Sequence, residues 1–204
     1  IIYLADIMMT DEITSSFDNR YALTGKFLVA MPSLDGSDCF SRSVVYICSH
    51  SNNGAMGLII NKRMDKFTFS DLTFQLPVKN YEKLNEVNLY TGGPLEQVRG
   101  MVLHTTDYMR DGTVAVADGL AVSSTSEIIS DIAFGHGPKE KLVALGYSFW
   151  QPRQLEAEIY NNDWLVIEAD KDILFRTPDE EKWQRALGET NIPLERFVNI
   201  TGHC

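Results

Sequence analysis

Cysteine, clustered basic residues and long apolar runs are all scarce in this 204-residue sequence. Its three cysteines (Cys39, Cys48 and Cys204) are too few and too scattered for the disulfide framework of a small secreted protein, and they favour a reducing compartment. No apolar run reaches the roughly 20 residues of a membrane-spanning helix, and residues 1–5 do not resemble a signal peptide. We therefore expect a cytoplasmic protein with no membrane partner.

The shortage of basic residues restricts the partners that the surface attracts. The chain has 28 acidic and 18 basic residues, which gives a formal net charge of -10. A field of this sign repels nucleic-acid backbones, and no segment interleaves clustered Lys and Arg with aromatic residues. Direct binding to nucleic acid is the least favoured function class.

Motifs for metals and for hydrolysis are missing too. The four histidines (His50, His104, His136 and His203) and the cysteines lack the paired spacing of a zinc module, and Gly-x-Ser-x-Gly does not occur. The sequence therefore predicts no metal, no cofactor and no catalytic residue. It favours a protein that is not an enzyme.

The composition is that of one globular domain. Hydrophobic residues make up 44% of the chain, and 204 residues are enough for one substantial core. Residues 1–24 show no sustained periodicity and are predicted to form an N-terminal arm. Residues 25–204 are predicted to form a single domain.

The pattern along this domain is rich in strands, with helices interspersed. Short apolar or alternating runs predict strands over residues 25–31, 43–48, 55–61, 87–90, 100–104, 113–117, 120–122, 141–150 and 164–168. The turn signals Asn53-Gly54 and Asp118-Gly119 predict two hairpins. A regular alternation of strands and helices is absent, so we expect a mixed sheet with helices packed on it.

Four helices are predicted from their start and stop signals. The first is a short helix over 67–76 capped by Ser70 or Asp71, and the second begins at a capping box formed by Ser124 and Glu127. The third follows Pro152 and carries Leu155, Ile159 and Tyr160 on one face, and the fourth begins at Thr177 and Pro178. Gly135 and Gly188 are expected to end the second and the fourth.

A glycine-bearing loop is the preferred candidate for recognition. Gly92, Gly93 and Pro94 follow a predicted strand, and backbone N–H groups in such a loop are able to bind an anion. Arg42, Asn61 and Arg99 complete a surface for a small anionic ligand or a protein partner. The alternative is a tight turn in which the glycines permit φ > 0 before the proline.

A thiol-dependent redox function is the second hypothesis. Cys48 and His50 stand two residues apart on a predicted strand, so their side chains should share a face. An exposed thiol beside an imidazolium would have a lowered pKa and would be reactive. The alternative is a buried core cysteine, because cysteine is among the most buried residue types.

Several short motifs together resemble the bacterial YqgE/AlgH family. They are Ala30-Met31-Pro32, Arg42 to Cys48, Gly54-Ala55-Met56-Gly57, Gly92-Gly93-Pro94, Arg99-Gly100, Leu103-His104, Ala144 to Tyr147, Trp150, Gln154-Leu155-Glu156 and Trp164-Leu165. The resemblance implies an α+β domain whose mostly antiparallel sheet forms a bifurcated pseudo-barrel. It also implies a cytoplasmic location, no established enzymatic activity and a suggested link to transcriptional regulation. Arg153 departs from the family pattern, because small residues or glycine are common there.

Overall fold

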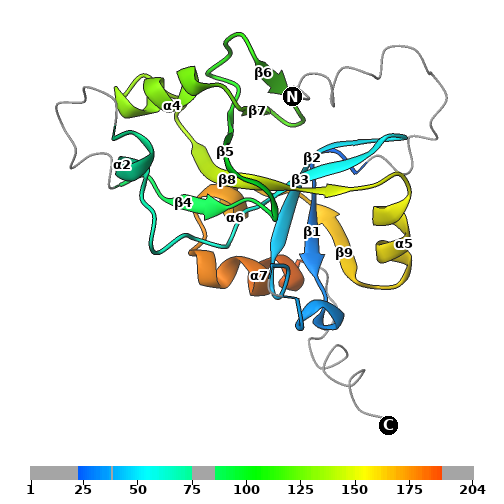
Figure 1. Cartoon of the computed structure of the whole chain (residues 1–204). Coiled ribbons are helices and arrows are strands. Elements are labelled where there is room, and N and C mark those ends of the chain that lie inside the picture. Colours follow the sequence, from blue (N-terminus) through cyan, green and yellow to red (C-terminus); the bar gives the residue numbers. More distant parts are fainter. Residues whose placement is uncertain (1–22, 38, 75–85, 190–204) are drawn as a thin grey trace.

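A curled sheet forms the centre of the molecule (Figure 1). The computed structural model describes residues 23–37, 39–74 and 86–189. Within these residues the sheet has nine strands, in the order β6-β7-β5-β8-β3-β2-β1-β9, and β4 pairs with β8 beside this path. The β4–β8 pairing is parallel and the others are antiparallel. The sheet curls into a half-barrel, which confirms the predicted α+β class.

Each described strand overlaps a predicted one. The strands are β1 (Lys26–Ala30), β2 (Val44–Ser51), β3 (Gly54–Ile59), β4 (Leu89–Thr91), β5 (Leu95–Thr105), β6 (Thr113–Ala115), β7 (Leu120–Ser123), β8 (Lys141–Trp150) and β9 (Trp164–Glu168). Both predicted hairpins form, between β2 and β3 and between β6 and β7. Asp118 and Gly119 both have positive φ, which explains why this dipeptide makes the second turn.

The long strand β8 divides the sheet into two parts. Its first half pairs with β4 and β5, whereas its last three residues pair with β3. Gly146, at the change of partner, has φ +75°, and a Cβ there would lie 2.6 Å from the carbonyl oxygen of Leu95. A glycine is needed at this point because the backbone is left-handed and crowded.

The helices differ more from the prediction than the strands do. They are α2 (Phe69–Leu72), α4 (Ser126–Ala133), α5 (Gln154–Tyr160), α6 (Lys171–Phe175) and α7 (Asp179–Gly188), with a short 3-10 turn, η2 (Pro32–Leu34). The sequence signals missed α6. No helix in the described part of the chain is long and apolar enough to cross a membrane.

Three of the predicted helix starts are wrong in detail. Thr68, not Ser70 or Asp71, caps α2, in a reciprocal pair with Asp71. The predicted Ser124/Glu127 capping box does not form, because α4 begins one residue later and its N-cap residue, Thr125, makes no side-chain cap hydrogen bond.

At α7 the N-cap residue is Pro178, and the Thr177 hydroxyl instead donates to the Asp172 carbonyl. On α5, Leu155 is buried as expected, but Tyr160 is 86% exposed.

Helices cover both faces of the curled sheet. Side chains of α6 and α7 pack with alternate residues of β1, β2 and β3 in the largest core cluster. The opposite faces of these strands pack against Leu155 of α5 and against Trp150 and Trp164. A third cluster joins α4 and Phe69 of α2 to strands β4, β5 and β8.

A buried ion pair anchors α7 to the sheet. Lys182 is 2% exposed, and its Nζ lies 2.8 Å from Oδ1 of Asp179 and donates to the carbonyl of Ile60 at 2.9 Å. The Tyr90 hydroxyl donates to the same carboxylate. Burial lowers the pKa of Lys182, and Asp179 opposes this effect. The network holds the helix against both β3 and β4 because every one of its polar groups has a partner.

Candidate functional site

The glycine-bearing loop is packed against the sheet where β8 changes partner. The N–H of Gly92 donates to the carbonyl of Leu145, and the Gly92 carbonyl accepts from Ile59. A Cβ on Gly93 would lie 2.2 Å from the carbonyl carbon of Tyr147. Close backbone approach therefore accounts for both glycines. Neither has a positive φ, so the predicted tight turn with left-handed glycines is wrong.

Asn61 holds the start of β2 in place. Its Oδ1 accepts from the N–H of Val44 at 2.8 Å, and its Nδ2 donates to the carbonyl of Arg42 at 2.9 Å. Arg42 has φ 50°, and its guanidinium lies over the ring of Trp183, 5.6 Å from the centroid. The Asn61 side chain thus stabilises a strained backbone at Arg42.

Arg99 lies on β5 and is paired within its own strand. Its guanidinium is 3.0 Å from the Glu96 carboxylate, which also accepts from the Tyr147 hydroxyl. Pro94 is exposed beside this pair. The side chains of Arg42, Asn61 and Arg99 thus already have partners within the protein.

The structure separates Cys48 from His50, so the predicted shared face is wrong. The pairing of β2 with β3 shifts between Ile47 and Ser49, which marks a β-bulge. Cys48 consequently faces the core cluster beneath α6 and α7. The His50 imidazole instead lies 3.0 Å from Glu156 on α5.

Cys48 has the environment of a structural cysteine. It is 0% exposed, and burial raises the pKa of its thiol. A redox cysteine needs an accessible thiolate, and burial disfavours it. Cys39, by comparison, is partly exposed.

We predict that Cys48 resists alkylation in the folded protein. Iodoacetamide should modify Cys39 first, and Cys48 should react only after urea unfolds the chain. Peptide-resolved mass spectrometry measures both sites in one sample. Equal rates at Cys39 and Cys48 in the folded protein would revive the redox hypothesis.

A Ser–His pair is also buried, in the β5–β7 region. His104 Nε2 lies 2.9 Å from the Ser123 hydroxyl, and its Nδ1 lies 2.9 Å from the carbonyl of Thr105. His104 and Ser123 are 0% and 1% exposed, and burial lowers the pKa of the histidine. The pair satisfies its own hydrogen bonds inside the core and presents no nucleophile to a substrate.

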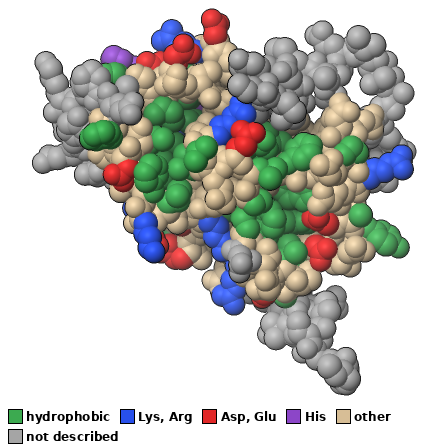
Figure 2. Space-filling view, in the orientation of Figure 1, with side chains coloured by type: hydrophobic (Ala, Val, Ile, Leu, Met, Phe, Trp, Pro, Cys, Tyr) green, Lys and Arg blue, Asp and Glu red, His purple; other side chains and the backbone are tan. Residues whose placement is uncertain are grey.

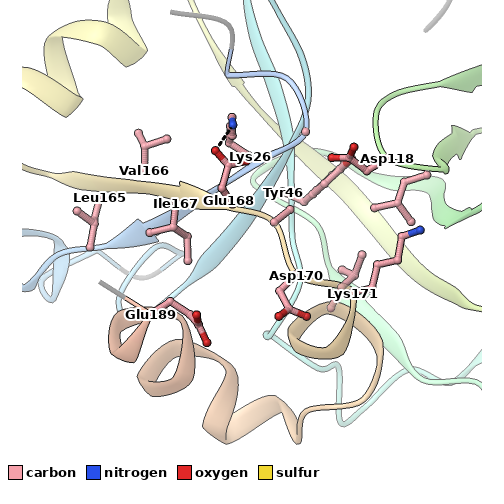
Figure 3. A pocket seen from close by; sticks show the side chains of 14 residues that line it. Lys26, Tyr46, Asp118, Leu165, Val166, Ile167, Glu168, Asp170, Lys171 and Glu189 are labelled. Carbon is pink, nitrogen blue, oxygen red and sulfur yellow. Dashed lines mark hydrogen bonds and ion pairs between the residues drawn. The ribbon is translucent and has the colours of Figure 1, made fainter. Parts of the chain in front are cut away.

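A large cavity lies at the seam of the half-barrel, and we call it the seam pocket (Figure 3). Its volume is about 960 Å³. It runs between β9 on one side and the β6–β7 turn on the other, with α6 and the end of α7 below. Its lining comprises residues 165–171 together with Gly25, Lys26, Tyr46, Asp118, Leu120, Leu174 and Glu189.

Tyr46 lies beneath the seam pocket, is 0% exposed, and has a buried hydroxyl without a hydrogen-bond partner. Among the described residues, two buried side-chain polar atoms lack a hydrogen-bond partner, Ser43 Oγ and the Tyr46 hydroxyl. Tyr46 lines the pocket, and its ring extends toward Asp118 in Figure 3. Burial, then Cys48 and Asp118, raises the pKa of this phenol, so it is a neutral group at physiological pH. A buried hydroxyl without a partner is uncommon and calls for an explanation.

Charged side chains line the seam pocket. Lys26 and Glu168 form an ion pair at the rim. Within the described part of the chain, no carboxylate lies within 4.0 Å of the Lys171 ammonium, and the Asp118 carboxylate has no ion-pair partner. The pocket therefore combines an apolar wall, formed by Leu165, Ile167 and Leu174, with free polar groups, as binding sites commonly do.

Sequence reasoning did not find this site. Tyr46 lies within an apolar run that predicts only a core strand, and Asp118 was explained by its turn. Lys171 begins the helix that the sequence signals missed. Only the curl of the sheet brings these three segments together. Among the described residues, no cluster of three or more potential metal ligands is present here or elsewhere.

Comparisons with known proteins extend over nearly the whole chain. Residues 27–195 match a family model described as AlgH-like. A UPF0301 protein of Rhodospirillum rubrum is 38% identical over 89% of this chain and 94% of its own length. A UPF0301 protein of Brucella melitensis is 42% identical over 89% and 94%, respectively.

Two solved structures are similar to the chain. The solution structure of the AlgH protein of Pseudomonas aeruginosa has a TM-score of 0.74 and 32% identity, covering 93% of this chain and all of that one. The crystal structure of a Corynebacterium diphtheriae protein has a TM-score of 0.68 and 25% identity, covering 95% of this chain and all of that one.

Proposed function

The chain belongs to the AlgH-like family, and on this premise we propose that it is a non-enzymatic binding module whose ligand occupies the seam pocket. The unpartnered, fully buried Tyr46 hydroxyl beneath the pocket is the observation that carries this proposal, and a ligand would reach it by displacing the side chains that cover it. The apolar wall supplies area to bury, and Asp118 and Lys171 supply groups that orient a ligand.

The energetics of Tyr46 favour a binding role over a structural one. A buried hydroxyl without a partner destabilises a protein by about 1–3 kcal/mol, and phenylalanine would fill the same space without this penalty. The ring itself is well used, because it packs edge-on against Phe27 with centroids 6.0 Å apart. A ligand that forms a hydrogen bond with the Tyr46 hydroxyl would explain why the protein has tyrosine here, although the hydroxyl destabilises the free protein.

We predict that Tyr46→Phe stabilises the free protein by about 1 kcal/mol, which for a chain of this size raises Tm by roughly 2–4 °C. Tyr90→Phe is the matched control, because the Tyr90 hydroxyl has a partner in Asp179. That substitution should lower stability by about 1 kcal/mol. Differential scanning calorimetry measures both. A loss of stability in Tyr46→Phe equal to that in Tyr90→Phe would show that the Tyr46 hydroxyl is satisfied.

Ligand binding is tested by thermal shift against a library of small polar-apolar molecules and short peptides. A compound that binds the native state alone raises Tm with its concentration. We expect at least one compound to stabilise the wild type and to lose most of this effect in Tyr46→Phe or Lys171→Met. Arg99→Ala, outside the pocket, should retain the response. The proposal fails if every stabilising compound acts equally on the pocket variants.

A further inference from the structure

Among the described strands, β9 lies at an edge of the half-barrel. It is the last strand in the order of the sheet, and β1 is its partner among the described strands. The N–H of Met31 donates to the carbonyl of Asp163, in register with the β1–β9 ladder. Because hydrogen-bonded pairs alternate in an antiparallel ladder, Leu165 and Ile167 are the β9 residues bonded to β1.

The remaining β9 residues direct their backbone groups away from the sheet. By the same alternation, the N–H and C=O groups of Trp164, Val166 and Glu168 point to the free edge. Such a row of groups is a template for an added strand. Proteins usually protect edges with proline, bulges or inward-pointing charge, whereas Trp-Leu-Val-Ile-Glu offers only Glu168, which Lys26 pairs.

The seam pocket follows this edge. Leu165 and Ile167 point to one face of β9 and Val166 to the other, as Figure 3 shows. All three nevertheless line the same pocket. A cavity that contacts residues of both faces runs beside the backbone, which is where an additional strand would lie.

The lining also indicates the chemistry of the added strand. Leu165, Ile167 and Leu174 form an apolar wall on one face, so every second residue of the strand should be apolar. The pocket lining carries four carboxylates, on Asp118, Glu168, Asp170 and Glu189, against the two ammonium groups of Lys26 and Lys171. The whole chain has a net charge of -10 as well, so both local and long-range fields attract a basic segment.

We propose that the seam pocket binds an extended, basic segment of another protein, which joins the half-barrel as a new edge strand beside β9. This inference rests on the proposed function and specifies its ligand. The added strand pairs with the outward groups of Trp164, Val166 and Glu168, its apolar residues lie over Leu165 and Ile167, and its basic residues face the acidic rim. Main-chain pairing supplies affinity and the alternate side chains supply specificity.

Residue-resolved hydrogen exchange of the full chain provides the first test. In the free protein the amides of Leu165 and Ile167 should be protected, and those of Val166 and Glu168 should exchange rapidly. Binding of the segment should protect the second pair. Protection of Val166 and Glu168 in the dilute free protein would show that the chain's own terminal residues occupy the edge. Protection that grows with protein concentration would show a second copy, and either result overturns the proposal.

A display library of random eight-residue peptides identifies the segment. We expect the selected peptides to be rich in Lys and Arg, with apolar residues at alternate positions. Val166→Pro removes one outward N–H without touching a bond to β1, and should weaken binding at least tenfold. Val166→Ala is its control, because it trims the same side chain and keeps the N–H. N-methylation of alternate peptide residues should abolish binding to the wild type, which tests the pairing without altering the protein.

The outcomes separate this inference from the proposed function. One outcome is that small molecules stabilise the wild type but not Tyr46→Phe, while the peptide library selects no peptide or only acidic ones. This outcome would support the proposed binding module and overturn the edge-strand ligand. Peptides that bind Val166→Pro as tightly as Val166→Ala would have the same consequence. Failure of both screens removes both proposals.

Discussion

Replacing Gly93 with alanine is expected to destabilise the protein by at least about 3 kcal/mol, because overpacking against backbone cannot be relieved by a rotamer change. The new Cβ would lie 2.2 Å and 2.3 Å from the carbonyl carbon and oxygen of Tyr147, and 2.4 Å from the Ser148 nitrogen. These atoms belong to the part of β8 where the sheet changes partner. Urea unfolding followed by circular dichroism measures the loss.

Gly188→Ala provides the matched control for this substitution. Gly188 ends α7, and a Cβ there meets nothing within 4 Å. Alanine is favoured over glycine in a helix by up to about 1 kcal/mol, so this variant should be slightly more stable than the wild type. If Gly93→Ala folds with unchanged stability, close packing does not require a glycine at this position. That result would support the hypothesis of an anion-binding loop.

Lys182→Met should destabilise the protein by about 3 kcal/mol, because removing one member of a buried ion pair leaves the other uncompensated. The substitution keeps an unbranched side chain without the ammonium group and leaves the Ile60 carbonyl without its donor. Asp179 would keep only the hydrogen bond from Tyr90, whose own pKa burial raises to about 12. Equilibrium unfolding in urea again provides the measurement.

A second substitution distinguishes the ion pair from simple loss of packing. Lys182→Met combined with Asp179→Asn removes the unpaired charge and retains an acceptor for Tyr90. The double variant should recover part of the lost stability, which gives a coupling between the two sites. Lys139→Met, on an exposed side chain, should change stability little. Additive effects of the two substitutions would mean that Asp179 and Lys182 do not act as a pair.

The strands were predictable because their signals are local. Apolar runs bounded by turn residues located each described strand, and Asp118-Gly119 located a hairpin whose two φ angles are positive. Helix α6 was not predictable in this way, since its five residues lie between two stronger signals. Asp170 caps its start by accepting from the N–H groups of Asp172 and Ile173, and Ile173 and Leu174 pack in the core.

The site was not predictable because it depends on register and on the curl of the sheet. Cys48 and His50 obey a two-residue alternation only where the strand is regular, and the bulge after Ile47 reverses it. Arg153 illustrates another limit. It has φ 66° at the start of α5, a conformation that favours glycine, so the type of residue at this position reflects the backbone.

The arginine-bearing region and the seam pocket differ in whether their polar side chains have partners within the protein. The side chains of Arg42, Asn61 and Arg99 each have an intramolecular partner, whereas the buried hydroxyl of Ser43, next to Arg42, has none among the described residues. Around Tyr46, Asp118 and Lys171 partners are missing within the described residues. In Figure 2 acidic and basic side chains are interspersed on the visible face, without a broad basic field. We therefore propose recognition at the seam of the half-barrel rather than at the arginine-bearing region.

Chemical-shift mapping of the full-length chain by NMR, during titration with the compounds and peptides selected above, tests this assignment most directly. We expect the perturbed amides to cluster at Tyr46, Asp118, Lys171 and along β9. Perturbations concentrated at Arg42, Gly93 and Arg99, with the residues of β9 unchanged, would contradict the account.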